Sequence, residues 1–517
     1  MPPPVLLLPD PLPTPPPTSS PTVVPQLLPV QDLSDLSLLV AAVVAVVDVV
    51  LRLVALAVVP QDRRPSSAMA WLLLIFFVPS LGVLAFLLIG SPKLPRVRRE
   101  KQASMSRLIE QESRGAEDVL ADHPWPPWVE GVARLNHALG AMPLLAGNDA
   151  HIVPRYEDQL RELAEGIAEA QRYVHVEFYI LSFDDATAPV FAAMEDAAAR
   201  GVTVRVLLDH IGSWRYPGYR RAVRELDRLG VQWRLMLPVQ PLRGRYQRPD
   251  LRNHRKLVVV DGETAFVGSL NLIDRTYDKR ATLKRGLLWQ DIIVRLQGPV
   301  VQEVDALFVT DWYSETDEVV AEIPDQLTEP APDRALHCQV VPSGPGFEGQ
   351  NNLKLFNSLL YGAQRRVSIT SPYFVPDESL LTAVTTAAER GVEVELFVGE
   401  IGDQLLVFHA QRSYYEALLR AGVRIWLYPA PYILHAKHLT VDDEVSVVGS
   451  SNLDIRSFEL DLELTLLVLG RDFTTELRAV EDGYRARSTE LTLEAWSGRG
   501  FWRRLADDLA RLTSAVQ

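Results

Sequence analysis

The sequence predicts an α/β protein in which two homologous halves pack together around a shared active site, preceded by an N-terminal transmembrane helical hairpin. A signature of polar residues occurs twice with identical internal spacing. Predicted helices and strands alternate in the same order before each copy, and two apolar runs stand near the start of the 517-residue chain. Repetition of one structural unit is typical of halves that bury a common core.

The start of the chain differs in composition from the rest. Residues 1–35 are rich in proline, and the first 30 contain no Lys or Arg. This predicts a disordered or polyproline-like tail and argues against a secretory signal, which needs a basic beginning. Two apolar runs follow at 36–59 and 68–89. Each has about the 20 residues that cross a bilayer as a helix; buried core helices are the alternative.

Charges in and around these runs indicate how the chain enters the membrane. Asp48 and Arg52 are four residues apart, so they can neutralise each other on one helix face. Basic residues outside a span favour the cytoplasm. The larger basic cluster follows the second run and comprises Lys93, Arg96, Arg98, Arg99 and Lys101. We therefore expect a multi-pass protein of the cell membrane with cytoplasmic catalytic domains and with this cluster against anionic headgroups.

Helical and extended segments alternate after a predicted connector at 90–155. The predicted order is helix 156–171, strand 174–181, helix 188–200 and strand 202–209, and the second half repeats it at 353–364, 366–373, 378–390 and 392–399. Such alternation is typical of a buried sheet covered by helices. We place the first half at 156–327, the second at 334–490 and a C-terminal helical tail at 491–517.

The repeated signature contains the residues that we expect to carry the chemistry. Each residue of the second copy lies 181 positions after its counterpart in the first (435 − 254). The first copy comprises His254, Lys256, Asp261, Ser269 and Asn271, and the second comprises His435, Lys437, Asp442, Ser450 and Asn452.

These residue types suit chemistry at a phosphodiester. A histidine can act as nucleophile, acid or base near neutral pH, and a lysine two positions later on a strand shares its face. The lysine would stabilise developing negative charge on phosphate oxygens, and Ser and Asn would add neutral donors to the same oxygens. One histidine from each half would supply a nucleophile and a general acid for covalent catalysis. We favour His254 as the nucleophile, although the sequence leaves that assignment open.

Composition excludes other classes of protein. The net charge of −14 and the pI near 5.3 argue against a nucleic-acid partner. Cys338 is the single cysteine, and no HExxH-like spacing occurs, so we expect no disulfide, no metal and no cofactor. A run of arginines before the first signature could be a basic rim that attracts anionic lipids or merely a solvated face. Its members are Arg215, Arg220, Arg221, Arg224, Arg228, Arg234, Arg243, Arg245, Arg248 and Arg252.

The two HxKxxxxD copies resemble the signature of the phospholipase D superfamily. The resemblance implies that one histidine forms a phosphohistidine intermediate and that the other protonates the leaving group. It also implies that Asp261 and Asp442 are more structural than catalytic and that an acidic residue further along orients the histidine ring. Glu463 fits that place in the second copy, and Asp291 fits it at a longer spacing in the first.

Segments outside the signatures resemble the bacterial cardiolipin synthases over about residues 36–490. They are Arg64-Pro-Ser-Ser-Ala-Met-Ala-Trp71, His175-Val-Glu177-Phe-Tyr-Ile, Gln339-Val-Val-Pro-Ser-Gly-Pro345 and Asn452-Leu-Asp-Ile-Arg-Ser-Phe458. That family implies transfer of a phosphatidyl group from one phosphatidylglycerol to another, giving cardiolipin and glycerol. It implies phosphatidylglycerol and other anionic lipids of the membrane as partners and leaves the oligomeric state open. The family often has Asn where this chain has Asp461, which bears on recognition of the acceptor.

Two alternatives remain from the sequence. A membrane-bound phospholipase D or transphosphatidylase would use water or another alcohol as acceptor, and its product would be phosphatidic acid or a mixed lipid. A non-enzymatic membrane scaffold would tolerate degraded signatures, whereas His and Lys are intact in both copies here.

Overall fold

The computed structural model describes residues 30–61, 63, 65–90, 93–112, 125–320, 336–347 and 349–512. Most of the predicted proline-rich tail, residues 1–29, lies outside them. The chain divides into two compact units, Met1–Phe86 and Leu87–Gln517, which we describe separately.

The N-terminal unit contains one helix that is long and apolar enough to cross a membrane. Helix α1 (Val30–Val58) begins six residues before the predicted run, and its part Ser37–Val58 has a mean hydropathy of 2.7 over 22 residues. The predicted pair between Asp48 and Arg52 forms at 2.8 Å.

The second apolar run, predicted as one transmembrane helix at 68–89, is divided into two helices. It forms α2 (Pro65–Phe77) and α3 (Pro79–Ile89), with a break at Val78. Proline disfavours helical geometry in the residue before it, which accounts for the break. The chain turns so sharply that a Cβ on Gly82 would lie 2.7 Å from the Cα of Ile75, so glycine is required there. Each helix, at 13 and 11 residues, is shorter than a bilayer span.

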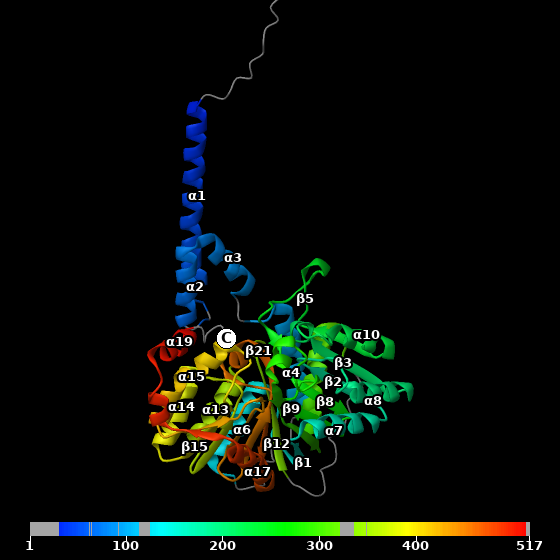
Figure 1. Ribbon diagram of the computed structural model, residues 1–517. Helices are drawn as coiled ribbons and strands as arrows, with labels where there is room; N and C mark the ends of the chain where they lie inside the picture. The colour runs from blue at the N-terminus through cyan, green and yellow to red at the C-terminus, as the bar shows by residue number, and fades with distance from the viewer. Residues whose placement is uncertain are drawn as a thin grey trace, which may run out of the picture. The chain divides into compact units, whose positions relative to one another are not determined.

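The sheet of the second unit has sixteen strands (Figure 1). Fifteen form one continuous order, to which the two halves contribute in the same spatial sequence, and β7 (Arg252–Asn253) pairs with β21 beside it. From the edge to the centre, the first half contributes β4 (Gln232–Met236), β3 (Thr203–Asp209), β2 (Tyr173–Phe178), β8 (Lys256–Val260), β9 (Thr264–Gly268), β11 (Ile293–Gln297) and β1 (Leu145–Val153). The second half contributes β16 (Arg424–Tyr428), β15 (Glu393–Gly399), β13 (Arg366–Thr370), β18 (His438–Val441), β19 (Val445–Gly449), β21 (Asp461–Leu469) and β12 (Leu336–Ser343). Strand β22 (Thr489–Leu491) extends the edge beside β16.

The central strands revise the predicted connector at 90–155. Strands β1 and β12 meet antiparallel at the centre of the sheet, with Leu145 opposite Cys338. Strand β1 therefore holds the same place in the first half as β12 holds in the second. The first half begins at least at Leu145, before the predicted boundary at residue 156. Gly147, Asn148 and Asp149 interrupt the apolar pattern of β1, which hid this strand in the sequence.

Helices cover both faces of the sheet, as the helix–strand alternation predicted. Leu257 and Val259 of β8 face one core, with α12 (Val300–Thr316), while Val258 and Val260 face another, with α7 (Tyr156–Ala168) and α8 (Ala188–Ala199). Both faces are therefore buried at β8, which is antiparallel to both of its neighbours, β2 and β9. The other helices of these layers are α4 (Arg96–Glu112), α6 (Pro127–Gly140), α10 (Tyr219–Leu229), α13 (Asn351–Gly362), α14 (Glu378–Glu389), α15 (Leu405–Arg420) and α17 (Arg471–Arg487).

Helices also follow the last edge strand, in the region predicted as a helical tail. They are α18 (Leu493–Ser497) and α19 (Phe501–Arg511). The buried Asp507 of α19 binds His409 of α15 at 2.7 Å and Arg499 at 2.6 Å, which fixes α19 against the second half.

Candidate active site

Short strands exchanged between the halves bring the two signatures together. His254 lies between β7 (Arg252–Asn253) and β8, and β7 pairs in parallel with β21 of the second half. His435 follows β17 (Tyr432–Leu434), which pairs in parallel with β10 (Leu288–Gln290) of the first half. The backbone N–H of His254 donates to Leu462 O and that of His435 to Gln290 O, both at 2.8 Å. We call this junction the seam, and both histidines are buried in it.

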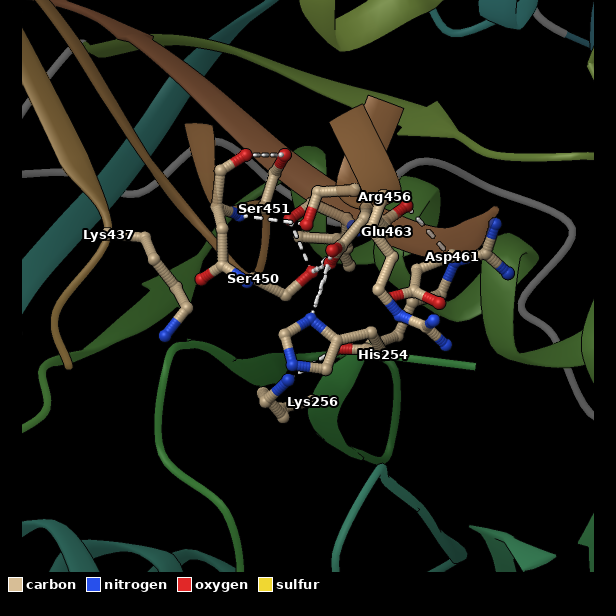
Figure 2. A network of polar contacts seen from close by, with 12 residues as sticks. His254, Lys256, Lys437, Ser450, Ser451, Arg456, Asp461 and Glu463 are labelled. Atoms are coloured by element: carbon tan, nitrogen blue, oxygen red, sulfur yellow. Dashed lines mark hydrogen bonds and ion pairs between the residues drawn. The ribbon is translucent and has the colours of Figure 1, made fainter. Parts of the chain in front are cut away.

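Each histidine is held by a carboxylate from the other half. Nδ1 of His254 donates to Glu463 at 2.9 Å (Figure 2). Nδ1 of His435 donates to Asp291 at 2.6 Å. The sequence assigned each acid to the histidine of its own copy, and that assignment was wrong. The exchange follows from the strand pairing, because β21 carries Glu463 beside β7, and Asp291 directly follows β10. Engagement of Nδ1 leaves Nε2 of each ring as the nitrogen available for chemistry.

The signature lysines lie beside the histidines. Lys256 and Lys437 each donate to the backbone carbonyl of the histidine two residues earlier, at 2.5 Å in both cases, and Figure 2 shows the Lys256 ammonium next to the His254 ring. Among the described residues, no carboxylate lies within 4.0 Å of either ammonium. Burial lowers the pKa of Lys256 to about 7 and that of Lys437 to about 8. The pair therefore presents positive charge to an anion that enters the seam.

The two imidazoles differ in their affinity for a proton. Burial, together with Lys256 and Lys437, lowers the pKa of His254 well below its usual value. Burial also lowers the pKa of His435, but Asp291 opposes that shift. Burial raises the pKa of Glu463 to about 7, whereas in Asp291 the attraction of His435 and Lys437 outweighs burial and holds the pKa below its usual range. His435, beside an ionised Asp291, therefore holds a proton more readily than His254 does.

The signature serines lie where they cannot act as predicted. Ser269 Oγ donates to Asp291 at 2.6 Å, and Ser450 Oγ donates to Glu463. Both hydroxyls are fully buried, and each also accepts a backbone N–H, from Ile292 and Leu464. The prediction that they bind substrate phosphate is therefore wrong, because their donors fix the two carboxylates that hold the histidines.

The signature asparagines differ from each other. Asn271 donates to the Tyr277 hydroxyl at 2.8 Å and accepts the N–H of Ile180 at 3.3 Å, so its side chain is engaged. Asn452 Oδ1 has no hydrogen-bond partner within the described chain. Of the two, Asn452 is the one whose amide remains open to a ligand.

The signature aspartates Asp261 and Asp442 hold the backbone far from the histidines. Asp261 follows the opposite end of β8 and accepts backbone N–H groups of residues 171–173 at 2.7 to 2.8 Å. Asp442 accepts those of residues 364–366 in the same way at the end of β18. They fix the starts of β2 and β13. Their grouping with the catalytic residues is corrected, and the structural role that the family resemblance implied fits these contacts.

The arginine run before the first signature is not one continuous rim. Arg252 is buried and binds Asp209 at 3.1 Å, and Arg228 binds Glu195 at 2.7 Å. Arg215, Arg220, Arg221, Arg224, Arg243 and Arg245 are exposed. Arg228 and Arg234 are exposed as well, so these eight arginines are the members of the run that can meet an anionic surface.

Arg456 and Asp461 are site residues to which the sequence assigned no role in the chemistry. Arg456 Nε lies 3.2 Å from Asp461 Oδ2, and a ring nitrogen of His254 lies within 4.8 Å of carboxylate oxygens of Asp461 and Glu463. A cation could bridge that spacing, but Arg456 and Lys256 already face these two carboxylates. The signal in the sequence was Asp461 at a position where the family often has Asn.

Known proteins match this chain over most of its length. Residues 163–312 and 357–481 match the family model described as cardiolipin synthase, PLD-like domain, and residues 40–91 match a phospholipase D-nuclease N-terminal model. The chain is 32% identical over 463 residues to cardiolipin synthase A of Pectobacterium atrosepticum, covering 88% of this chain and 94% of that protein.

The chain belongs to the cardiolipin synthase family. Cardiolipin synthase A of Proteus mirabilis is 33% identical over 468 residues, with the same shares of each chain covered. The crystal structure of phosphatidylserine synthase from Haemophilus influenzae aligns with a TM-score of 0.55 at 15% identity, over 75% of this chain and 100% of that one. It supports the two-half α/β fold.

Proposed function

We propose that this chain is a cardiolipin synthase that transfers a phosphatidyl group from one phosphatidylglycerol to another and releases glycerol. The observation that carries the proposal is the seam, where each half supplies one histidine, one lysine and the carboxylate that orients the other histidine. Neither half has a complete set alone. Membership of the cardiolipin synthase family supports the choice of substrate.

His254 acts as the nucleophile in this proposal. Its Nε2 attacks phosphorus, and the bond between phosphorus and the oxygen of the headgroup glycerol breaks. His435 gives its proton to that departing oxygen. A phosphatidyl-histidine remains. A hydroxyl of the second phosphatidylglycerol then gives its proton to His435 and attacks phosphorus, which releases His254. The assignment rests on the lower proton affinity of His254 and on the ionised Asp291 beside His435.

Lys256, Lys437 and Asn452 stabilise the non-bridging phosphate oxygens in this mechanism. The two lysine ammonium groups lie beside the histidines, where charge develops as the phosphorus centre rearranges. Asp291 and Glu463, supported by Ser269 and Ser450, orient the imidazoles. Asp261 and Asp442 contribute indirectly, because they fix the backbone at the starts of β2 and β13.

The membrane arrangement is also proposed. Helix α1 spans the bilayer, and the bent α2–α3 pair returns the chain to the side where it entered. The basic cluster that follows α3 keeps the catalytic unit cytoplasmic. Its members are Lys93, Arg96, Arg98, Arg99 and Lys101. Exclusion of water at the membrane favours an alcohol acceptor over hydrolysis.

The proposal is tested with purified full-length protein and labelled phosphatidylglycerol in vesicles, without nucleotide and with a chelator. We expect cardiolipin and glycerol in equal amounts, since one phosphodiester replaces another of similar energy and the lysines supply the charge. Added glycerol should slow or reverse the reaction. Phosphatidic acid as the main product would favour a phospholipase D. A strict requirement for a cytidine-diphosphate-activated lipid or a divalent cation would refute the mechanism.

The lysines predict the alkaline limit of the reaction. An ammonium is charged below its pKa, so kcat/KM should fall as pH rises through the values of about 7 for Lys256 and about 8 for Lys437. A bound phosphodiester favours the charged amine, so kcat should fall only at higher pH. Initial rates in vesicles at several lipid concentrations, from about pH 5 to about pH 9, give the pH dependence of kcat/KM and of kcat. A kcat/KM that stays constant above neutral pH would contradict this expectation.

A further inference from the structure

Asp461 carries an unused hydrogen-bond acceptor into the seam. It begins β21 two residues before Glu463, so both side chains leave the strand on the same face (Figure 2). Arg456 Nε lies 3.2 Å from Oδ2, and the Arg456 guanidinium also donates to Asp250 O at 2.7 Å, which fixes it in place. Oδ1 has no partner within the described chain, and the residue is 5% exposed.

A buried carboxylate oxygen without a donor is costly, so its presence beside His254 indicates that a ligand supplies the donor. In a phosphodiester lipid with a polyol headgroup, the phosphate and acyl-ester oxygens only accept hydrogen bonds. The headgroup hydroxyls are its donors. Arg456 and Lys256 already offset the charge of this carboxylate, whereas Glu463, Asp454 and Asp209 add negative charge around it. The test therefore includes a cationic acceptor beside the neutral ones.

We propose that Oδ1 of Asp461 binds the hydroxyl adjacent to the reacting one in the glycerol headgroup, so that the site selects vicinal diols as leaving group and acceptor. The inference rests on the proposed phosphatidyl transfer. Because attack and departure retrace one path, the same oxygen contacts the leaving glycerol and the attacking headgroup. The neighbouring Asp454 differs, because its Oδ1 accepts the N–H of Ser457 at 2.7 Å and, of the two residues, only Asp461 has a buried side-chain oxygen without a hydrogen-bond partner within the described chain.

The test compares acceptors within one reaction. Phosphatidylglycerol vesicles receive equal amounts of 1-propanol, 1,2-propanediol and ethanolamine, and mass spectrometry measures the ratio of the phosphatidyl-alcohol products. Burial raises the pKa of Asp461 to about 7, so the comparison is made above that pH, where the carboxylate is charged. A hydrogen bond to a charged group is worth enough to give about a tenfold or greater preference for the diol in the native protein. In Asp461→Ala the ratio of diol product to propanol product should fall close to one. In Asp461→Asn, which has a neutral side chain, this ratio should lie between those of the native protein and Asp461→Ala. Asp454→Asn is the matched control and should keep the native ratio.

The ratio does not depend on how much enzyme is active, and alcohol partition into the vesicles cancels between variants. An equal diol preference in the native protein and Asp461→Ala would overturn the inference, as would a preference for ethanolamine that Asp461→Ala removes. A divalent-cation requirement that Asp461→Ala abolishes would show that Oδ1 binds a metal instead. Absence of any phosphatidyl-alcohol or cardiolipin from the native protein would count against the proposed function itself.

Discussion

Replacement of either His254 or His435 by alanine is expected to remove nearly all phosphatidyl transfer while the protein still folds and inserts. Loss of a general acid costs about 10²–10⁴ in rate, and loss of the nucleophile removes the covalent route. Neither ring can replace the other, because each is fixed by its own carboxylate from the opposite half. The measurement is cardiolipin formation in vesicles. His151→Ala is the control, since it removes an exposed imidazole that is paired with Glu476 outside the seam.

A substrate with an activated leaving group separates the two roles. A phosphatidyl ester of p-nitrophenol needs no general acid, because nitrophenolate departs without a proton. His435→Ala should therefore regain nitrophenolate release and accumulate a phosphatidyl adduct on His254, which peptide mapping can locate. His254→Ala should stay inactive with the same ester. Rescue of His254→Ala instead would reverse the assignment, and near-normal cardiolipin synthesis by either variant would contradict a composite site.

Lys256→Met and Lys437→Met are each expected to slow transfer by about 10²–10³, the usual cost of one donor to a developing phosphate charge. Thermal stability should stay equal or rise. A buried ammonium with a pKa of about 7 or about 8 is held there at the expense of folding, and methionine fills a similar volume without charge. A lower rate together with an equal or higher melting temperature would indicate that the lysines stabilise the substrate phosphate and not the fold.

Purified variants are compared by melting temperature and by initial rate at saturating lipid. Lys354→Met, at an exposed position on α13, is the matched control and should change neither quantity. A large loss of stability together with a native rate per folded molecule would show that the lysines are structural.

Much of the fold was predictable because its signals are local. Alternating apolar patterns predicted α7, β2, α8 and β3, and the matching elements of the second half, to within a few residues. The division of the second apolar run has a local cause in Pro79, which stands inside the run in the sequence, although the run was predicted as one helix. Strand β1 was missed because polar residues interrupt its pattern and its partners, β11 and β12, lie far away in the chain.

The candidate site divides in the same way. The sequence by itself determined that two histidines and two lysines recur at identical spacing and that Asp291 and Glu463 accompany them. The tertiary structure alone decided which carboxylate holds which histidine and that the serines bind those carboxylates. It also decided that an Asp461 oxygen in this site has no partner within the described chain. The physical reason is the seam. Strands β7 and β10 hydrogen-bond to β21 and β17 of the other half, and the partner of a strand is set by long-range packing, which spacing within one copy does not encode.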